Sequence, residues 1–99
     1  MTKKFAHVVY KITFPNGKIY VGKDVGTDGH SIAYFGSWNT KLVENDFSKN
    51  ELKDFAIRRE ILFEHVDVKV VSQAEIVLIV ELGANNPEIG YNRRPKFKG

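Results

Sequence analysis

The sequence Pro15-Asn16-Gly17 lies between two segments of strand-forming residues, and this turn constrains the fold more than any other feature of the chain. Residues 5–14 are rich in Val, Ile, Tyr, Phe and Thr, and residues 18–21 continue that composition. Proline presets the first central position of a type I turn, asparagine suits the second, and glycine takes the left-handed position of a following bulge. The sequence therefore predicts a β-hairpin with a three-residue loop.

The length of this loop decides which side chains share a face, because side chains alternate between the two faces along a strand. A three-residue loop places Ile12 opposite Tyr20 and Tyr10 opposite Gly22, so both tyrosines project from one face. A two-residue Asn-Gly turn would place Thr13 opposite Tyr20 and separate the phenols. We favour the three-residue loop.

Two further elements are expected downstream. Residues 55–63 alternate well enough for a third strand that carries Arg59 and the apolar side chains Phe55, Ile57, Ile61 and Phe63 on one face. Residues 73–82 form the clearest helix, because Ser72-Gln73-Ala74-Glu75 matches a capping box and Gly83 is a natural terminator. The apolar surface of this helix predicts burial on all sides.

The remaining segments are less informative. An irregular loop is expected at 24–29, a helix at 37–46, and either a strand extension or a connector at 66–71. We place no domain boundary, so residues 1–99 are expected to form a single α/β domain.

Composition narrows the class of protein. The absence of cysteine excludes disulfides, a thiolate nucleophile and a zinc site of the usual kind, and it suggests a reducing, cytoplasmic compartment. No apolar run reaches the roughly 20 residues of a membrane span, and the first residues do not match a signal peptide. The net charge of +3 suits a polyanionic partner without specifying one.

Glu75 is the most informative acidic residue. On a helix it is followed on the same face by Leu78, Ile79 and Leu82, so its carboxylate lies at the first turn of an apolar stripe, where it can hold a hard cation. The alternative is structural, because the third position of a capping box already has a role in the helix. Each tyrosine, Lys23 and Asn92 likewise has an ordinary structural explanation when taken alone.

Taken together, the motifs resemble those of the GIY-YIG nuclease domain. They occur in the order that this family shows, over about residues 6–95: Val8-Val9-Tyr10, Tyr20-Val21-Gly22-Lys23, the strand segment at 57–62, helical Glu75, and Gly90-Tyr91-Asn92. The resemblance implies a small three-stranded antiparallel sheet flanked by helices. It also implies a DNA endonuclease that hydrolyses a phosphodiester bond with Mg²⁺ or Mn²⁺.

The resemblance further implies roles for individual residues. Glu75 would bind the metal, Tyr10 would help to activate the attacking water, and Tyr20 would hydrogen-bond at the scissile phosphate. Lys23 would lower a phenol pKa or bind phosphate, and Asn92 would position the glutamate or the sheet. Contacts with nucleic acid are expected from His30, Lys41, Arg59, Arg93 and Arg94.

The chain departs from the family pattern at two places. Val8-Val9 replaces Gly-Ile in the first motif, and residues 23–57 contain no arginine where the family places its catalytic one. Arg58 is the best substitute for stabilising charge at the phosphate, and Lys41 is a weaker candidate. The alternatives are a catalytically degenerate nucleic-acid-binding module on the same fold and a protein-interaction domain. A partner protein or a homodimer is a further expectation for targeting.

Overall fold

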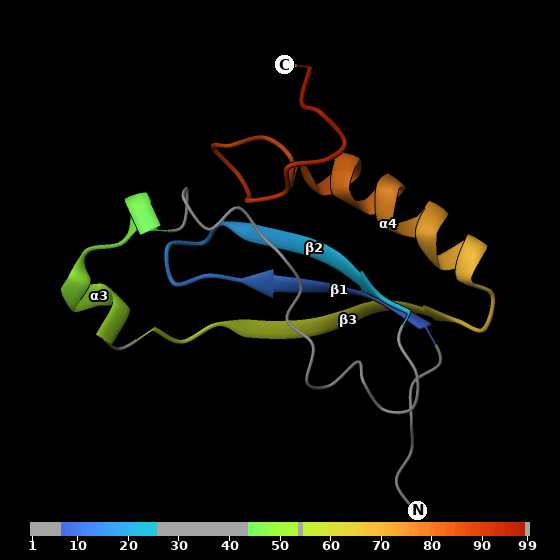
Figure 1. The fold of residues 1–99 in the computed structure, drawn as a ribbon, viewed down its shortest axis with the longest axis horizontal. Coiled ribbons are helices and arrows are strands. Elements are labelled where there is room, and N and C mark those ends of the chain that lie inside the picture. The colour runs from blue at the N-terminus through green and yellow to red at the C-terminus, as the bar shows by residue number, and fades with distance from the viewer. Residues whose placement is uncertain (1–6, 26–43, 54, 99) are drawn as a thin grey trace, which may run out of the picture.

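The computed structural model describes residues 7–25, 44–53 and 55–98, which form an α+β arrangement (Figure 1). Its elements, in chain order, are β1 (His7–Thr13), β2 (Ile19–Asp24), α3 (Lys49–Lys53), β3 (Arg58–His65) and α4 (Val68–Leu82). The three strands form one antiparallel sheet in the order β2-β1-β3. The expected small antiparallel sheet with accompanying helices is therefore present.

The hairpin has the predicted three-residue loop. The amide of Phe14 donates to the carbonyl of Lys18 at 2.9 Å, and Gly17 has a φ of 87°. Tyr10 pairs with Gly22 and Ile12 with Tyr20, as that loop requires. The two tyrosine rings share a face with their centroids 6.4 Å apart, so the predicted register is confirmed.

Apolar layers cover both faces of the central strand β1. One core contains Tyr10, Ile12, Phe14 and Tyr20, while the other joins Val9 and Val21 to α4. Helix α4 packs on the second of these faces and contacts all three strands (Figure 1). Val8, Val9 and Tyr10 in the middle of β1 are fully buried, so this part of the strand is a continuous apolar run, whereas Lys11 further along is only partly buried.

The predicted face of the third strand is correct only in part. Phe55, Ile57 and Ile61 pack against the tyrosine-containing core, whereas Phe63 packs against the core under α4. The cause is a shift in register: Val9 pairs with Phe63 and Tyr10 with Ile61. The extra residue on β3 forms a bulge, which moves every later side chain to the other face.

Helix α4 begins earlier than predicted. Its N-cap is Asp67, whose carboxylate accepts a hydrogen bond from the Lys69 amide at 2.9 Å, so Ser72 does not cap the helix. The segment 66–71 is therefore mostly helical instead of a strand extension or connector. The predicted end is confirmed, because Gly83 adopts the left-handed conformation with a φ of 73°.

The prediction that α4 is buried on all sides is wrong for the described part of the chain. Val71 and Ile79 are buried, but Val77 and Val80 on the other side of the helix are exposed. No helix in this part of the chain combines the length and apolar character needed to cross a membrane. The helix expected at 37–46 and the loop expected at 24–29 lie largely outside the described residues, although residues 44–46 are helical.

The close pairing of Gly22 with Tyr10 gives a first prediction. A Cβ atom at Gly22 would lie 2.6 Å from the Tyr10 hydroxyl and 3.0 Å from the Tyr20 ring. Gly22→Ala should therefore lower the free energy of unfolding by about 1–3 kcal/mol, the usual cost of overpacking. Urea denaturation of this variant, beside Val25→Ala just after the strand, measures the effect. A change below about 0.5 kcal/mol at Gly22 would contradict the close packing.

Candidate functional site

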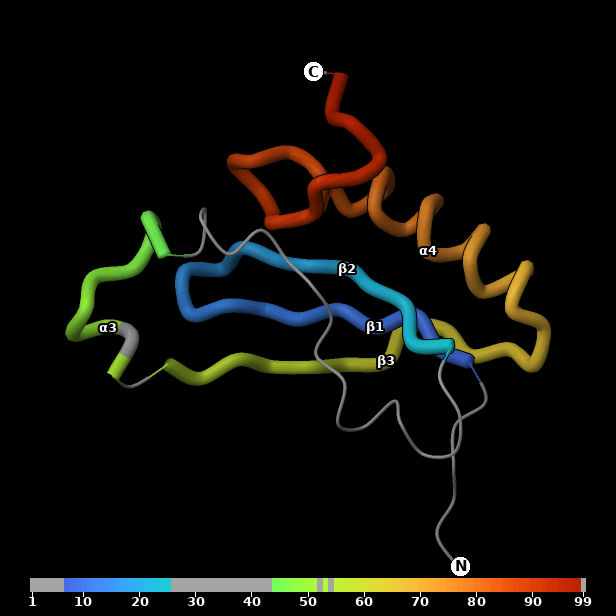
Figure 2. The backbone as a smooth tube through the Cα atoms, in the orientation of Figure 1, coloured from blue at the N-terminus to red at the C-terminus, as the bar shows by residue number. Residues whose placement is uncertain are grey.

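The chain after α4 turns back alongside β2, the edge strand of the sheet (Figure 2). The Ile19 amide donates to the Ile89 carbonyl at 3.0 Å, and the Tyr91 amide donates to the Ile19 carbonyl at 2.8 Å. These bonds form a short parallel bridge between Ile19 and Gly90. The backbone groups that an edge strand would otherwise leave unpaired are thus used to hold the C-terminal segment in place.

Asn92 continues this pairing with its side chain. Its Oδ1 accepts a hydrogen bond from the Val21 amide at 2.8 Å, and its Nδ2 donates to the Val21 carbonyl at 2.6 Å. The amide side chain therefore takes both hydrogen bonds that another strand would make with Val21. Asn92 therefore fixes the sheet edge and the point where the following residues leave it.

Glu75 on α4 lies beside the next outward-facing backbone amide of β2, that of Lys23. Backbone amides of alternate strand residues point the same way, so the Lys23 amide faces outward like those of Ile19 and Val21. Partial burial raises the pKa of the Glu75 carboxyl above its ordinary value, while the Lys23 ammonium and then the Lys23 backbone amide act in the opposite direction. Glu75 is thus a half-buried carboxylate held between α4 and the edge of β2.

Lys23 connects the strand to the helix. Its Nζ donates to the Ser72 hydroxyl at 2.7 Å. Because Ser72 lies one helical turn before Glu75, this bond keeps the ammonium close to the carboxylate. Ser72, expected as a helix cap, therefore contributes to the site by holding Lys23.

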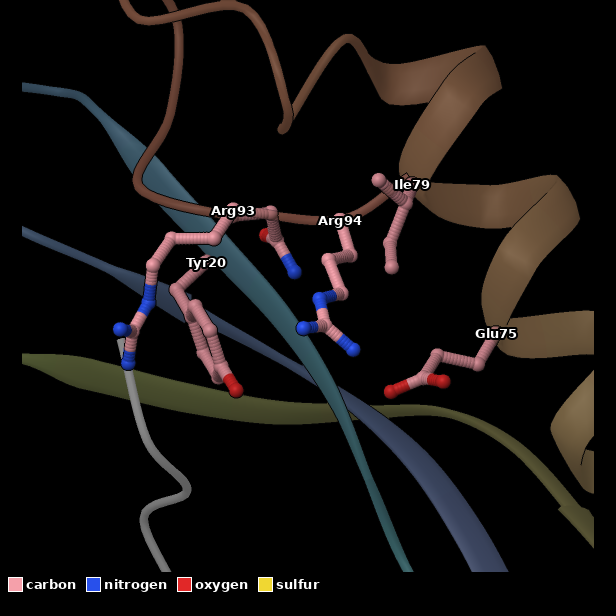
Figure 3. A pocket seen from close by; sticks show the side chains of 6 residues that line it. Tyr20, Glu75, Ile79, Arg93 and Arg94 are labelled. Carbon is pink, nitrogen blue, oxygen red and sulfur yellow. The ribbon is translucent and has the colours of Figure 1, made fainter. Parts of the chain in front are cut away.

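A cavity of about 420 Å³ opens at this edge of the sheet (Figure 3). Its lining residues come from β2, α4 and the C-terminal segment: Tyr20, Glu75, Ile79, Asn92, Arg93 and Arg94. In Figure 3 the Arg94 guanidinium lies between the Tyr20 ring and the Glu75 carboxylate. Residues that are far apart in the sequence thus present a phenol, a carboxylate and two guanidinium groups to one space.

Tyr10 does not line this cavity. Its side chain is fully buried, next to Tyr20, and the Arg59 guanidinium carbon lies 4.5 Å from the centre of its ring. This distance allows a cation–π interaction. Arg59, for which the sequence predicted a contact with nucleic acid, thus packs on the ring of Tyr10.

The structure places Arg58 away from the cavity. Its side chain is 76% exposed on β3, and its nearest described acidic partner is Glu60, at 3.9 Å. The third-strand segment thus directs its two arginines to different places, and neither lines the space beside Glu75. His30 and Lys41 lie outside the described residues.

The sequence predicted only a general contact with nucleic acid for Arg93 and Arg94. Their position directly after Asn92 could have predicted that they line the same cavity, because a residue fixed at a site holds its neighbours in the chain near that site. Comparisons of the chain with protein-family models, curated proteins and solved structures give no match.

Asn92 supplies a second prediction. Asn92→Ala leaves the amide and the carbonyl of Val21 without their partners, and each such group costs about 1–3 kcal/mol. Allowing for partial rehydration, the free energy of unfolding should fall by about 2–4 kcal/mol, whereas Lys96→Ala in the exposed tail should change it by less than about 0.5 kcal/mol. Urea denaturation of both variants tests this, and equal stabilities would show that Asn92 does not hold the edge.

Proposed function

We propose that the chain is a metal-dependent DNA endonuclease of the GIY-YIG type. The observation that carries this proposal is the shared cavity of Tyr20, Glu75 and Asn92, three residues that belong to the sequence motifs. The resemblance does not depend on their spatial arrangement. Their convergence at one edge of the sheet supports reading them as a single site.

The charges around the cavity suit a phosphodiester. Arg93 and Arg94 line it, and the Lys23 ammonium is held beside Glu75, so the positive groups outnumber the single lining carboxylate. Guanidinium and ammonium groups bind phosphate oxygens through charge-assisted hydrogen bonds. The same arrangement would repel a cationic substrate.

Glu75 is the residue that would hold the metal. Burial raises the pKa of its carboxyl, so a divalent cation would compete with a proton there and would bind better as the pH rises. In the described part of the chain, no group of three His, Cys, Asp or Glu residues could share the ion. Water and phosphate oxygens would complete its coordination. When bound, Mg²⁺ supplies Lewis-acid stabilisation of charge on the leaving 3′ oxygen.

The two tyrosines take different parts in this proposal. Tyr20 lines the cavity, where its hydroxyl would hydrogen-bond a phosphate oxygen or the attacking water. Tyr10 packs against Tyr20 from the buried side, so its contribution is to fix the orientation of that ring. An ordinary phenol has a pKa of about 10 and is protonated at neutral pH. A tyrosine that takes a proton from the attacking water at this pH would therefore need the help of the nearby positive charges.

A second candidate function is nucleic-acid binding without cleavage. The observation that favours it is the exposure of both Arg93 and Arg94 on a segment that continues to Lys96 and Lys98. Exposed cations on one segment can bind a phosphate backbone without any chemistry at Glu75. The two functions differ in whether DNA is cut.

Nicking of supercoiled plasmid in Mg²⁺ or Mn²⁺ tests the proposal. Glu75→Ala should lower the nicking rate at least about 100-fold, because it removes charge stabilisation of several kcal/mol. Glu81→Ala is the matched control, since Glu81 is an exposed glutamate on the same helix and does not line the cavity.

The alternatives give separate outcomes. DNA binding that weakens steeply with salt, without nicking by the parent protein, would replace the nuclease with the binding module. The absence of salt-sensitive DNA binding would contradict both.

A further inference from the structure

We propose that Arg94, from the segment after α4, is the arginine that binds the scissile phosphate. This inference rests on the proposed nuclease function and deepens it, because it moves the charge-stabilising role from Arg58 to a residue on another part of the fold. The starting observation is that Arg94 lines the cavity with Tyr20 and Glu75.

Phosphodiester hydrolysis requires a positive group at the reacting phosphate. The oxygen of one water forms a bond to phosphorus, the bond from phosphorus to the leaving 3′ oxygen breaks, and that oxygen takes a proton. The water's other hydrogen remains on the new terminal phosphate or leaves to solvent. Negative charge grows on the phosphoryl oxygens during this exchange, and a planar guanidinium can donate two hydrogen bonds to them.

Hydrogen bonds hold the backbone on both sides of Arg94. On one side, Asn92 is bound to the amide and the carbonyl of Val21. On the other side, the Asn85 Nδ2 donates to the Pro95 carbonyl at 2.7 Å. Only Arg93 and Arg94 lie between these two anchors. The guanidinium groups therefore extend from a fixed segment, which lowers the entropy lost when they bind phosphate.

Arg94 is better placed than the other candidate arginines. Its guanidinium lies between Tyr20 and Glu75, whereas Arg93 extends along the other side of the Tyr20 ring (Figure 3). Arg58 is near Glu60, and Arg59 packs on the ring of Tyr10. Arg94 makes no ion pair with any described carboxylate. It is thus available to an anionic ligand at the point where Tyr20 and Glu75 meet.

Three alanine variants test this assignment in single-turnover plasmid nicking, with DNA affinity measured separately at the same salt concentration. Arg94→Ala should lower the nicking rate about 100-fold or more, the usual loss when one donor to transition-state charge is removed. Its DNA affinity should fall less than about tenfold, since one phosphate contact among several is lost. Arg58→Ala should nick within about threefold of the parent, and Arg93→Ala should mainly weaken binding.

Arg94→Lys separates charge from geometry. Lysine keeps the positive charge but cannot form the paired hydrogen bonds of a guanidinium, so its nicking rate should stay well below that of the parent. The inference is overturned by a loss below about tenfold in Arg94→Ala, by a larger loss in Arg58→Ala, or by a rate loss that the fall in DNA affinity explains fully. These results all require a parent that nicks; a parent without nicking would contradict the nuclease proposal itself.

Discussion

The outer edge of β2 is the constraint on which the candidate site depends. An edge strand needs partners for its backbone groups, and here those partners are the 89–91 backbone, the Asn92 side chain and α4, with Glu75 beside the Lys23 amide. The same bonds that complete the sheet thereby bring the carboxylate and the arginine segment together. The stability of the β2 edge and the arrangement of the residues that line the cavity consequently depend on the same hydrogen bonds.

Local turn chemistry made the hairpin predictable from the sequence. Proline, asparagine and glycine in that order define a loop length, and the loop length then fixes the register of Tyr10 with Gly22 without any tertiary information. The end of α4 was predictable for a similar reason, because Gly83 accepts a conformation that other residues resist. The motifs also selected Tyr20, Glu75 and Asn92, which line one cavity.

The rest depends on contacts between distant segments. Val68 to Val71 have strand propensity, so tertiary packing and the Asp67 cap together decide that this stretch is helical. The bulge on β3 comes from how the strand fits β1, which no pattern within the strand reveals. Likewise, the position of Arg94 beside Glu75 follows from the pairing of the C-terminal segment with β2, whereas the family pattern drew attention to Arg58 as the substitute for the missing arginine.

The proposed nuclease site requires a divalent cation to bind where the edge of β2, α4 and the C-terminal segment meet. Titration of ¹⁵N-labelled protein with Mn²⁺ tests it most directly, because the ion broadens the NMR signals of nearby amides. We expect the first broadening at Lys23, Glu75 and Arg94, with its loss in Glu75→Gln. Broadening centred elsewhere, such as near Asp46 or Glu60, and unchanged by Glu75→Gln would contradict the account.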